Sequence, residues 1–202
     1  MATRQKRLGF GLIVLSLATG LTAGAAELGR NTAPPTINNT RSPMAAELGP
    51  ATGLQLALVA PAQVFPENYA VSGLRLNLLY GRNRALRGLD LGLVNAVSGG
   101  VQGAQLGLGN LAGDLAGLQL GFYNEAAASE MGCCQIGAIN FLRGDGSQGA
   151  MFGIFNLADN LSGFQLGLVN ICNTLDGLQV GLINIISQSD VLIFCPIVNA
   201  QF

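Results

Sequence analysis

Apolar and polar residues alternate in short segments that recur along most of the chain. The segment at 163–170, GFQLGLVN, has apolar residues at its second, fourth and sixth positions, with glutamine and glycine between them. A period of two is typical of a strand, because successive side chains point to opposite faces. The same unit, G-h-Q-h-G-h-h-N with h apolar, begins at Gly88, Gly103, Gly117, Cys133, Gly149, Gly163 and Gly177. We therefore expect an all-β fold with one such strand per unit.

Each unit ends on an asparagine, and the sequence numbers of successive asparagines differ by 14, 15 or 16. These asparagines are Asn95, Asn110, Asn124, Asn140, Asn156, Asn170, Asn184 and, in the last segment, Asn199. The fifth position of the full units is glycine, at Gly92, Gly107, Gly121, Gly137, Gly153, Gly167 and Gly181. Glycine inside a strand indicates a bend or the close approach of another surface, and we favour the bend. A period this regular predicts a repeat architecture.

Two architectures fit one strand per repeat of this length. In a parallel β-solenoid each repeat is one coil, and identical residues stack along the axis. In a ten-stranded up-and-down transmembrane β-barrel, neighbouring strands are antiparallel and short turns alternate with longer loops. The connections here are of nearly constant length, tryptophan is absent, and proline at 61 and 196 disturbs a closed sheet. Stacked asparagines would also bond to one another and to the turn backbone. We favour the solenoid, with degenerate N-terminal repeats, and keep the barrel as the alternative.

The two faces of each strand differ in chemistry. We assign the three apolar residues of a unit to the interior, which leaves the glutamine and glycine face, or the asparagine edge, to contact a partner. A small residue follows two places after the asparagine, and a leucine often lies three places further on. The examples are Ala112, Ala126, Ala158 and Cys172, and Leu115, Leu161 and Leu175. This pattern indicates a short second strand that also points inward.

The segments outside the regular units have different compositions. Residues 1–25 combine Arg4, Lys6 and Arg7 with an apolar run at 8–21 and a small-residue cleavage pattern, which predicts a signal peptide; a retained N-terminal anchor is the alternative. Residues 26–50 are rich in proline and asparagine and predict a disordered linker. We expect degenerate repeats forming a cap at 51–87, regular repeats at 88–190 and a C-terminal capping strand at 191–202. The arginines at 82, 84 and 87 indicate a solvated turn or a site for an anionic headgroup or glycan.

Composition restricts the chemistry that the chain can perform. There is no histidine, which excludes Ser-His-Asp and Cys-His catalysis and histidine-based zinc sites. From Gly88 onward a single base, Arg143, stands against eight acidic residues, so no nucleic-acid partner is expected. The four cysteines lack a C-x-x-C spacing, and we interpret Cys134, Cys172 and Cys195 as buried filler, with disulfides left open. Aspartates recur in the connections, at Asp114, Asp145, Asp159, Asp176 and Asp190. Three interpretations fit this pattern: calcium ligands, the paired carboxylates of a glycosidase, and solubilising residues. We favour the last.

The repeats resemble a known bacterial family. GFQLGLVN, GLQVGLIN and the closing VLIFCPIVNAQF are similar to the surface-repeat family built on G-x-Q-x-G-x-x-N units, over residues 51–202. The resemblance implies an exported envelope or surface protein of Gram-negative type, and it supplies no catalytic residue.

Together these features predict a non-catalytic scaffold without a cofactor. We expect it at the cell surface, outer membrane or periplasm. Its partner would be an unidentified protein or glycan of the envelope, or the outer membrane itself. A small outer-membrane barrel and, more weakly, a glycan-active enzyme on a β-helix scaffold are the alternatives.

Overall fold

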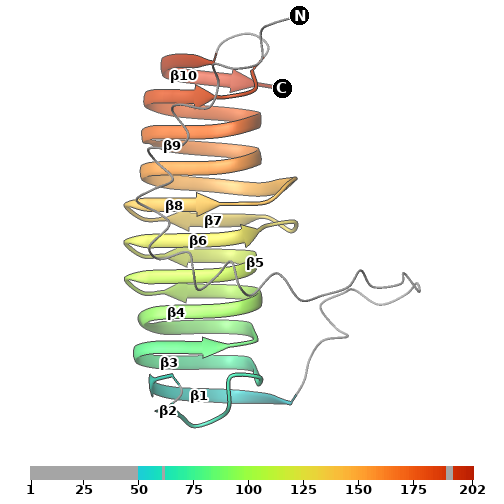
Figure 1. Cartoon of the computed structure of the whole chain (residues 1–202), viewed down its shortest axis with the longest axis vertical. Coiled ribbons are helices and arrows are strands. Elements are labelled where there is room, and N and C mark those ends of the chain that lie inside the picture. Colours follow the sequence, from blue (N-terminus) through green and yellow to red (C-terminus); the bar gives the residue numbers. More distant parts are fainter. Residues whose placement is uncertain (1–49, 61, 190–192) are drawn as a thin grey trace, which may run out of the picture. The chain divides into compact units, whose positions relative to one another are not determined.

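The computed structural model describes residues 50–60, 62–189 and 193–202. Within these ranges the regular secondary structure consists of strands alone (Figure 1). The expected signal peptide at 1–25 and all but the last residue of the expected linker at 26–50 lie outside the described residues. In the described part of the chain there is no helix that could cross a membrane.

Ten strands follow one another along the chain and wind into stacked coils (Figure 1). They are β1 (Ala51–Val59), β2 (Ala62–Gln63), β3 (Ala70–Asn83), β4 (Ala85–Leu106), β5 (Gly109–Leu120), β6 (Tyr123–Ala128), β7 (Cys133–Ile136), β8 (Ile139–Leu142), β9 (Ser147–Ile186) and β10 (Phe194–Gln201).

Neighbouring coils pair in parallel, and equivalent residues of successive repeats lie side by side. β1 pairs with β3, β3 with β4 and β4 with β5, all in parallel. The register places Asn110 between Asn95 and Asn124, as the repeat alignment predicts. The predicted parallel β-solenoid, with one coil per repeat, is therefore confirmed. The alternative of an up-and-down barrel is wrong, because its neighbouring strands would be antiparallel.

Each coil contains two strand segments that face each other across the interior. We call the segment from the first to the fifth position the Gln strand, and the segment that begins at the asparagine the Asn strand. In the middle coils a bend separates the two, for example at 121–122 between β5 and β6. The stacks of these segments are the Gln sheet and the Asn sheet. The side-chain amide of Gln119 donates to the backbone carbonyl of Glu125, which shows that the two sheets lie in contact.

The apolar core comes mainly from the Asn strands and from the connections that follow them. Leu115, Leu161 and Leu175 are buried, as are Ala126 and Cys172. The predicted second, inward-pointing strand is therefore confirmed. These residues belong to one buried apolar cluster that contains members from Val71 to Ile186.

The assignment of the apolar residues of the Gln strands to the interior is wrong. Leu120 and Leu166 are 40% and 43% exposed, whereas Gln119 and Gln165 beside them are fully buried. The Gln strand thus turns its apolar side outward and its polar side inward. The physical reason is that the inward amides satisfy one another between coils, as described below.

Antiparallel strands occupy both ends of the stack. β2 pairs antiparallel with the end of β1, and β10 pairs antiparallel with residues 177–185 of β9. Because β10 runs in the opposite direction, Asn199 lies opposite Gln179. The alignment of Asn199 with the repeat asparagines is therefore incorrect, and it belongs to the glutamine column.

Candidate functional site

The repeat asparagines form a continuous hydrogen-bonded ladder inside the solenoid. The Nδ2 group of each asparagine donates to Oδ1 of the asparagine in the next coil, at 2.8 to 2.9 Å from Asn95 to Asn184. The same Nδ2 groups also donate to a backbone carbonyl of the next Gln strand, such as that of Leu120. A net hydrogen bond contributes about 1 kcal/mol, so the ladder stabilises each interface between the coils that contain Asn95 to Asn184.

A second ladder runs along the glutamine column, in the opposite direction. Nε2 of Gln119 donates to Oε1 of Gln105 at 2.9 Å, and Gln135 donates in turn to Gln119 at 2.8 Å. Glutamine donors therefore point toward earlier coils, whereas asparagine donors point toward later ones. Sequence reasoning predicted the asparagine stacking and missed the glutamine ladder. The available signal was the same: an identical amide at one position in successive repeats.

Met151 interrupts the glutamine ladder. Nε2 of Gln165 lies 3.4 Å from the methionine sulfur, a weak acceptor. On the other side, Oε1 of Gln135 is buried without a hydrogen-bond partner among the described residues. The ladder resumes when Gln179 donates to Gln165 at 2.7 Å.

A buried ion pair replaces glutamine at the second and third places of this column, directly after Gln55. The guanidinium of Arg75 forms two hydrogen bonds to the carboxylate of Asp90, and both side chains are fully buried. Asn77 and Gln105 also donate to the Asp90 carboxylate, at 2.9 and 3.1 Å. Buried charges persist only with such complete pairing. This site holds the first coils together, and its carboxylate is closed to solvent.

The stacking of the coils explains both glycine columns, with Cys133 as the one exception in the first column of the regular units. At the first position, φ is +152° at Gly163, and a Cβ there would lie 1.9 Å from the carbonyl oxygen of Gly149. At the fifth position, a Cβ on Gly167 would lie 2.6 Å from Nδ2 of Asn156 and 2.5 Å from the carbonyl oxygen of Gly153. Close approach of the neighbouring coil therefore explains glycine at the fifth position of every regular unit. The bend that we favoured from the sequence is present as well, but only in the middle coils.

The exterior of the Gln sheet, together with the residue that follows each Gln strand, is an apolar surface, which we call the leucine face. It consists of the second, fourth and sixth positions of each coil, and every residue in these columns is apolar. In chain order they are Leu54, Leu56, Leu58, Leu74, Leu76, Leu78, Leu89, Leu91, Leu93, Ala104, Leu106, Leu108, Leu118, Leu120, Phe122, Cys134, Ile136, Ala138, Ala150, Phe152, Ile154, Phe164, Leu166, Leu168, Leu178, Val180 and Leu182. The sixth position includes the most exposed side chains of the face, with 63% at Phe122 and 65% at Leu182.

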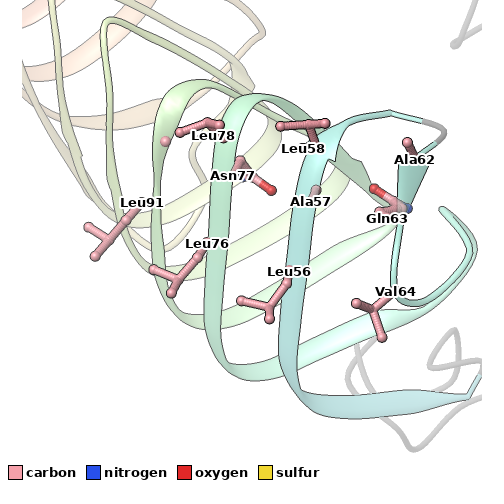
Figure 2. A pocket seen from close by; sticks show the side chains of 11 residues that line it. Leu56, Ala57, Leu58, Ala62, Gln63, Val64, Leu76, Asn77, Leu78 and Leu91 are labelled. Atoms are coloured by element: carbon pink, nitrogen blue, oxygen red, sulfur yellow. The ribbon is translucent and has the colours of Figure 1, made fainter.

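The leucine face is hollowed at its N-terminal end. Figure 2 shows Leu56, Leu76 and Leu91 in one row and Leu58 and Leu78 in a second row. The open groove between the rows has a volume of about 860 Å³, and Val64, which follows β2, borders it. It continues the apolar character of the face and contains no charged side chain.

The other exterior surfaces carry charge. On the Asn sheet, Nε of Arg143 lies 2.8 Å from the Glu125 carboxylate, which also accepts a hydrogen bond from the Tyr123 hydroxyl at 2.6 Å. Burial, followed by that hydrogen bond, raises the pKa of Tyr123. The arginine at 82 belongs to the same sheet and lies 3.8 Å from Glu67.

Polar side chains line the edge formed by the connections. There Asp145 accepts a hydrogen bond from Asn160, and Ser162 donates to Asp176 at 3.4 Å. Asp145, Asp159 and Asp176 thus hydrogen-bond to polar residues of adjacent coils. Oδ1 of Asp114 is buried without a hydrogen-bond partner among the described residues, and Asp190 lies outside them. Among the described side chains, no three acidic, cysteine or histidine residues gather into a possible metal site.

All four cysteines are free thiols. Cys133 and Cys172 are buried, and burial raises the pKa of Cys133 to about 11 and that of Cys172 to about 12. The prediction of buried filler is confirmed for Cys172 and wrong for Cys134 and Cys195, which are partly exposed; Cys134 lies in the second column of the leucine face. Buried thiols with raised pKa values are poor nucleophiles, so packing is the role that the structure gives to Cys133 and Cys172.

Comparison of the chain with protein-family models, with curated proteins and with solved structures gave no match.

Proposed function

We propose that this chain is a non-catalytic repeat protein of the bacterial envelope or cell surface, exported and acting as an interaction scaffold. The observation that carries the proposal is the leucine face, an uncharged surface that extends along the stack of coils from Leu54 to Leu182. Apolar patches beyond a few hundred Å² are rare on monomeric proteins and mark interaction sites.

The interior supports this proposal by making the surface rigid. Glutamine and asparagine amides occupy the inward positions and bond coil to coil, for example Gln119 to Gln105 and Asn110 to Asn124. The buried amide groups are thus occupied by hydrogen bonds between coils. Contacts with a partner are left to the exposed side chains. The expected signal peptide at 1–25 supports export.

Fractionation of a Gram-negative host that expresses the complete chain tests the proposal. We expect cleavage near residue 25, measured by mass spectrometry, and recovery of the processed chain in the envelope or periplasmic fraction. Carbonate extraction should release it from membranes. An unprocessed chain in the cytosol, or full retention in membranes after carbonate, would count against an exported scaffold.

A further inference from the structure

We propose that the leucine face binds the leucine face of a second copy of this chain, giving a two-fold symmetric dimer. The inference rests on the proposed function, because it names the partner of the scaffold surface. Four observations carry it: the area of the face, its lack of charge, the placement of one large and one small residue, and the composition of the rest of the exterior.

The area of the face is that of a stable interface. With about 4.8 Å between strands and about 3.4 Å per residue, the columns from Leu54 to Leu178 cover about 38 by 14 Å before side-chain widths are added. With those widths, each copy would bury about 750 Å², and two copies about 1,500 Å², within the usual range of specific interfaces. Two apolar sheets pack face to face at about 10 Å in the same way in β-sandwiches.

The chemistry of the face selects a partner without charge. The Asn sheet carries Arg82, Glu125 and Arg143, and the connection edge carries aspartates such as Asp145 and Asp176. Burial of any of these against leucine would leave a charge in an apolar interface, which is costly. Of the surfaces described, only the leucine face lacks charged side chains. A second leucine face can therefore cover it without burying a charge.

The sixth column contains a large and a small residue in the fifth and sixth coils, which are neighbours near the middle of the face. Its bulkiest residue is Phe122 and its smallest is Ala138, and β7 and β8 form the coil that follows β5 and β6. Consider a two-fold axis parallel to the strands that passes between these two coils. It would place Phe122 of each copy over Ala138 of the other, so a large side chain meets a small one twice. A two-fold interface requires this reciprocal contact.

A lipid surface suits the face less well than a second copy. Proteins that lie on membranes combine an apolar face with flanking lysine or arginine and with interfacial tryptophan. This chain has no tryptophan, and the region from Gly88 onward has one arginine and no lysine. Its excess of acidic residues is repelled by anionic headgroups.

Measurement of the molar mass of the purified chain by light scattering and sedimentation tests the dimer. We expect a dimer for the wild type and, for the Leu120→Glu/Leu166→Glu variant, at least a 100-fold rise in the dimer dissociation constant. Ile171→Glu on the Asn sheet is the control and should stay dimeric. Circular dichroism must show the same strand content in all three chains. A monomeric wild type, or dimer loss only with Ile171→Glu, would overturn the proposal.

Cross-linking with a short bis-maleimide tests the position of the axis, with Cys195→Ala in every chain. Cys134 lies in a coil near the middle of the face, so Cys134 of one chain should be linked to Cys134 of the second chain. Cys134→Ala should abolish this cross-link. Leu120→Cys, also in a middle coil, should restore it. Leu56→Cys, near the end of the face, should not, because the two-fold arrangement separates the two copies of that residue. A link through Leu56→Cys but not through Leu120→Cys would overturn this arrangement.

Flotation of a monomeric wild type with phosphatidylcholine vesicles would identify lipid as the occupant and overturn the dimer. These outcomes are separate from failure of the proposed function, which is measured by cellular location.

Discussion

Asn77 and Gly81 exchange, within β3, the positions that glycine and asparagine hold in the later coils. Asn77 pairs with Gly92 in the fifth column, and Gly81 pairs with Asn95 in the asparagine column. A Cβ on Gly81 would lie 1.9 Å from Oδ1 of Asn77. One amide therefore fills one space, and it can come from either strand. From the Gln strand, Nδ2 of Asn77 still donates to Oδ1 of Asn95, at 3.0 Å.

Exchange of these two residues should show strong coupling. Gly81→Asn alone places two amides in one space, and Asn77→Gly alone leaves Oδ1 of Asn95 without this donor. We expect each single variant to be destabilised by about 2 kcal/mol, and the double variant to be more stable than either by at least about 1 kcal/mol. Urea unfolding of the four chains measures the coupling, and additive effects of the two changes would contradict the shared space.

Alanine at the fifth position should be much more costly than alanine at a glycine outside the glycine columns. Gly167→Ala would force a methyl group against the amide of Asn156 and the backbone of Gly153, at a cost of about 2–3 kcal/mol. Gly109 is the matched control, because a Cβ there would lie 3.8 Å from the nearest atoms, in the Val94 side chain. Denaturant midpoints compare the two variants, and equal midpoints would show that close approach does not explain the column.

Repair of the glutamine ladder should stabilise the solenoid. In Met151→Gln the new Nε2 group can donate to the unpaired Oε1 of Gln135, and the new Oε1 can accept from Gln165. We expect a gain of about 1 kcal/mol in the free energy of unfolding, since each net hydrogen bond contributes about that amount and side-chain ordering offsets part of it. Met151→Leu keeps the volume without the amide and serves as the control. A thermal midpoint no higher than that of the Leu variant would contradict the prediction.

Alkaline pH should destabilise the fold through its buried thiols. The pKa of Cys172 rises from an ordinary value of 9.0 to about 12 on folding, because burial disfavours the thiolate. The unfolded chain thus loses its proton first, and the stability contributed by the neutral thiol is present below pH 9 and lost between about 9 and 12. Cys172→Ala, which introduces the residue found at 112, 126 and 158, should weaken this pH dependence in unfolding experiments. An unchanged pH profile would assign the effect to other groups.

The repeat period and the asparagine column were enough to predict parallel coils. Asparagine at one position in successive units is informative because an amide is both donor and acceptor, so identical copies satisfy one another when stacked. The inward leucines at 115, 161 and 175 were predictable for a similar reason, since they recur at a fixed distance from the asparagine.

The orientation of the Gln strand was not predictable from alternation alone. A period of two defines two faces but does not say which one is buried. The usual rule places Leu120 inside and Gln119 outside, and it fails here because stacked glutamines need no water. The reciprocal exchange of Asn77 and Gly81, and the pairing of Asn199 with Gln179, depend on contacts between coils and on strand direction, which the repeat alignment does not contain.

The opposite directions of the two amide ladders have a consequence for chain length. Each added coil contributes one asparagine donor that points forward and one glutamine donor that points back, so the two side-chain dipoles largely cancel. Electrostatic strain therefore does not accumulate as the solenoid grows. Because each of these bonds joins only adjacent coils, loss of one unit such as 163–176 would bring the coils on either side into the same register. Genes for this architecture can thus lengthen or shorten by whole repeats while the interior stays intact.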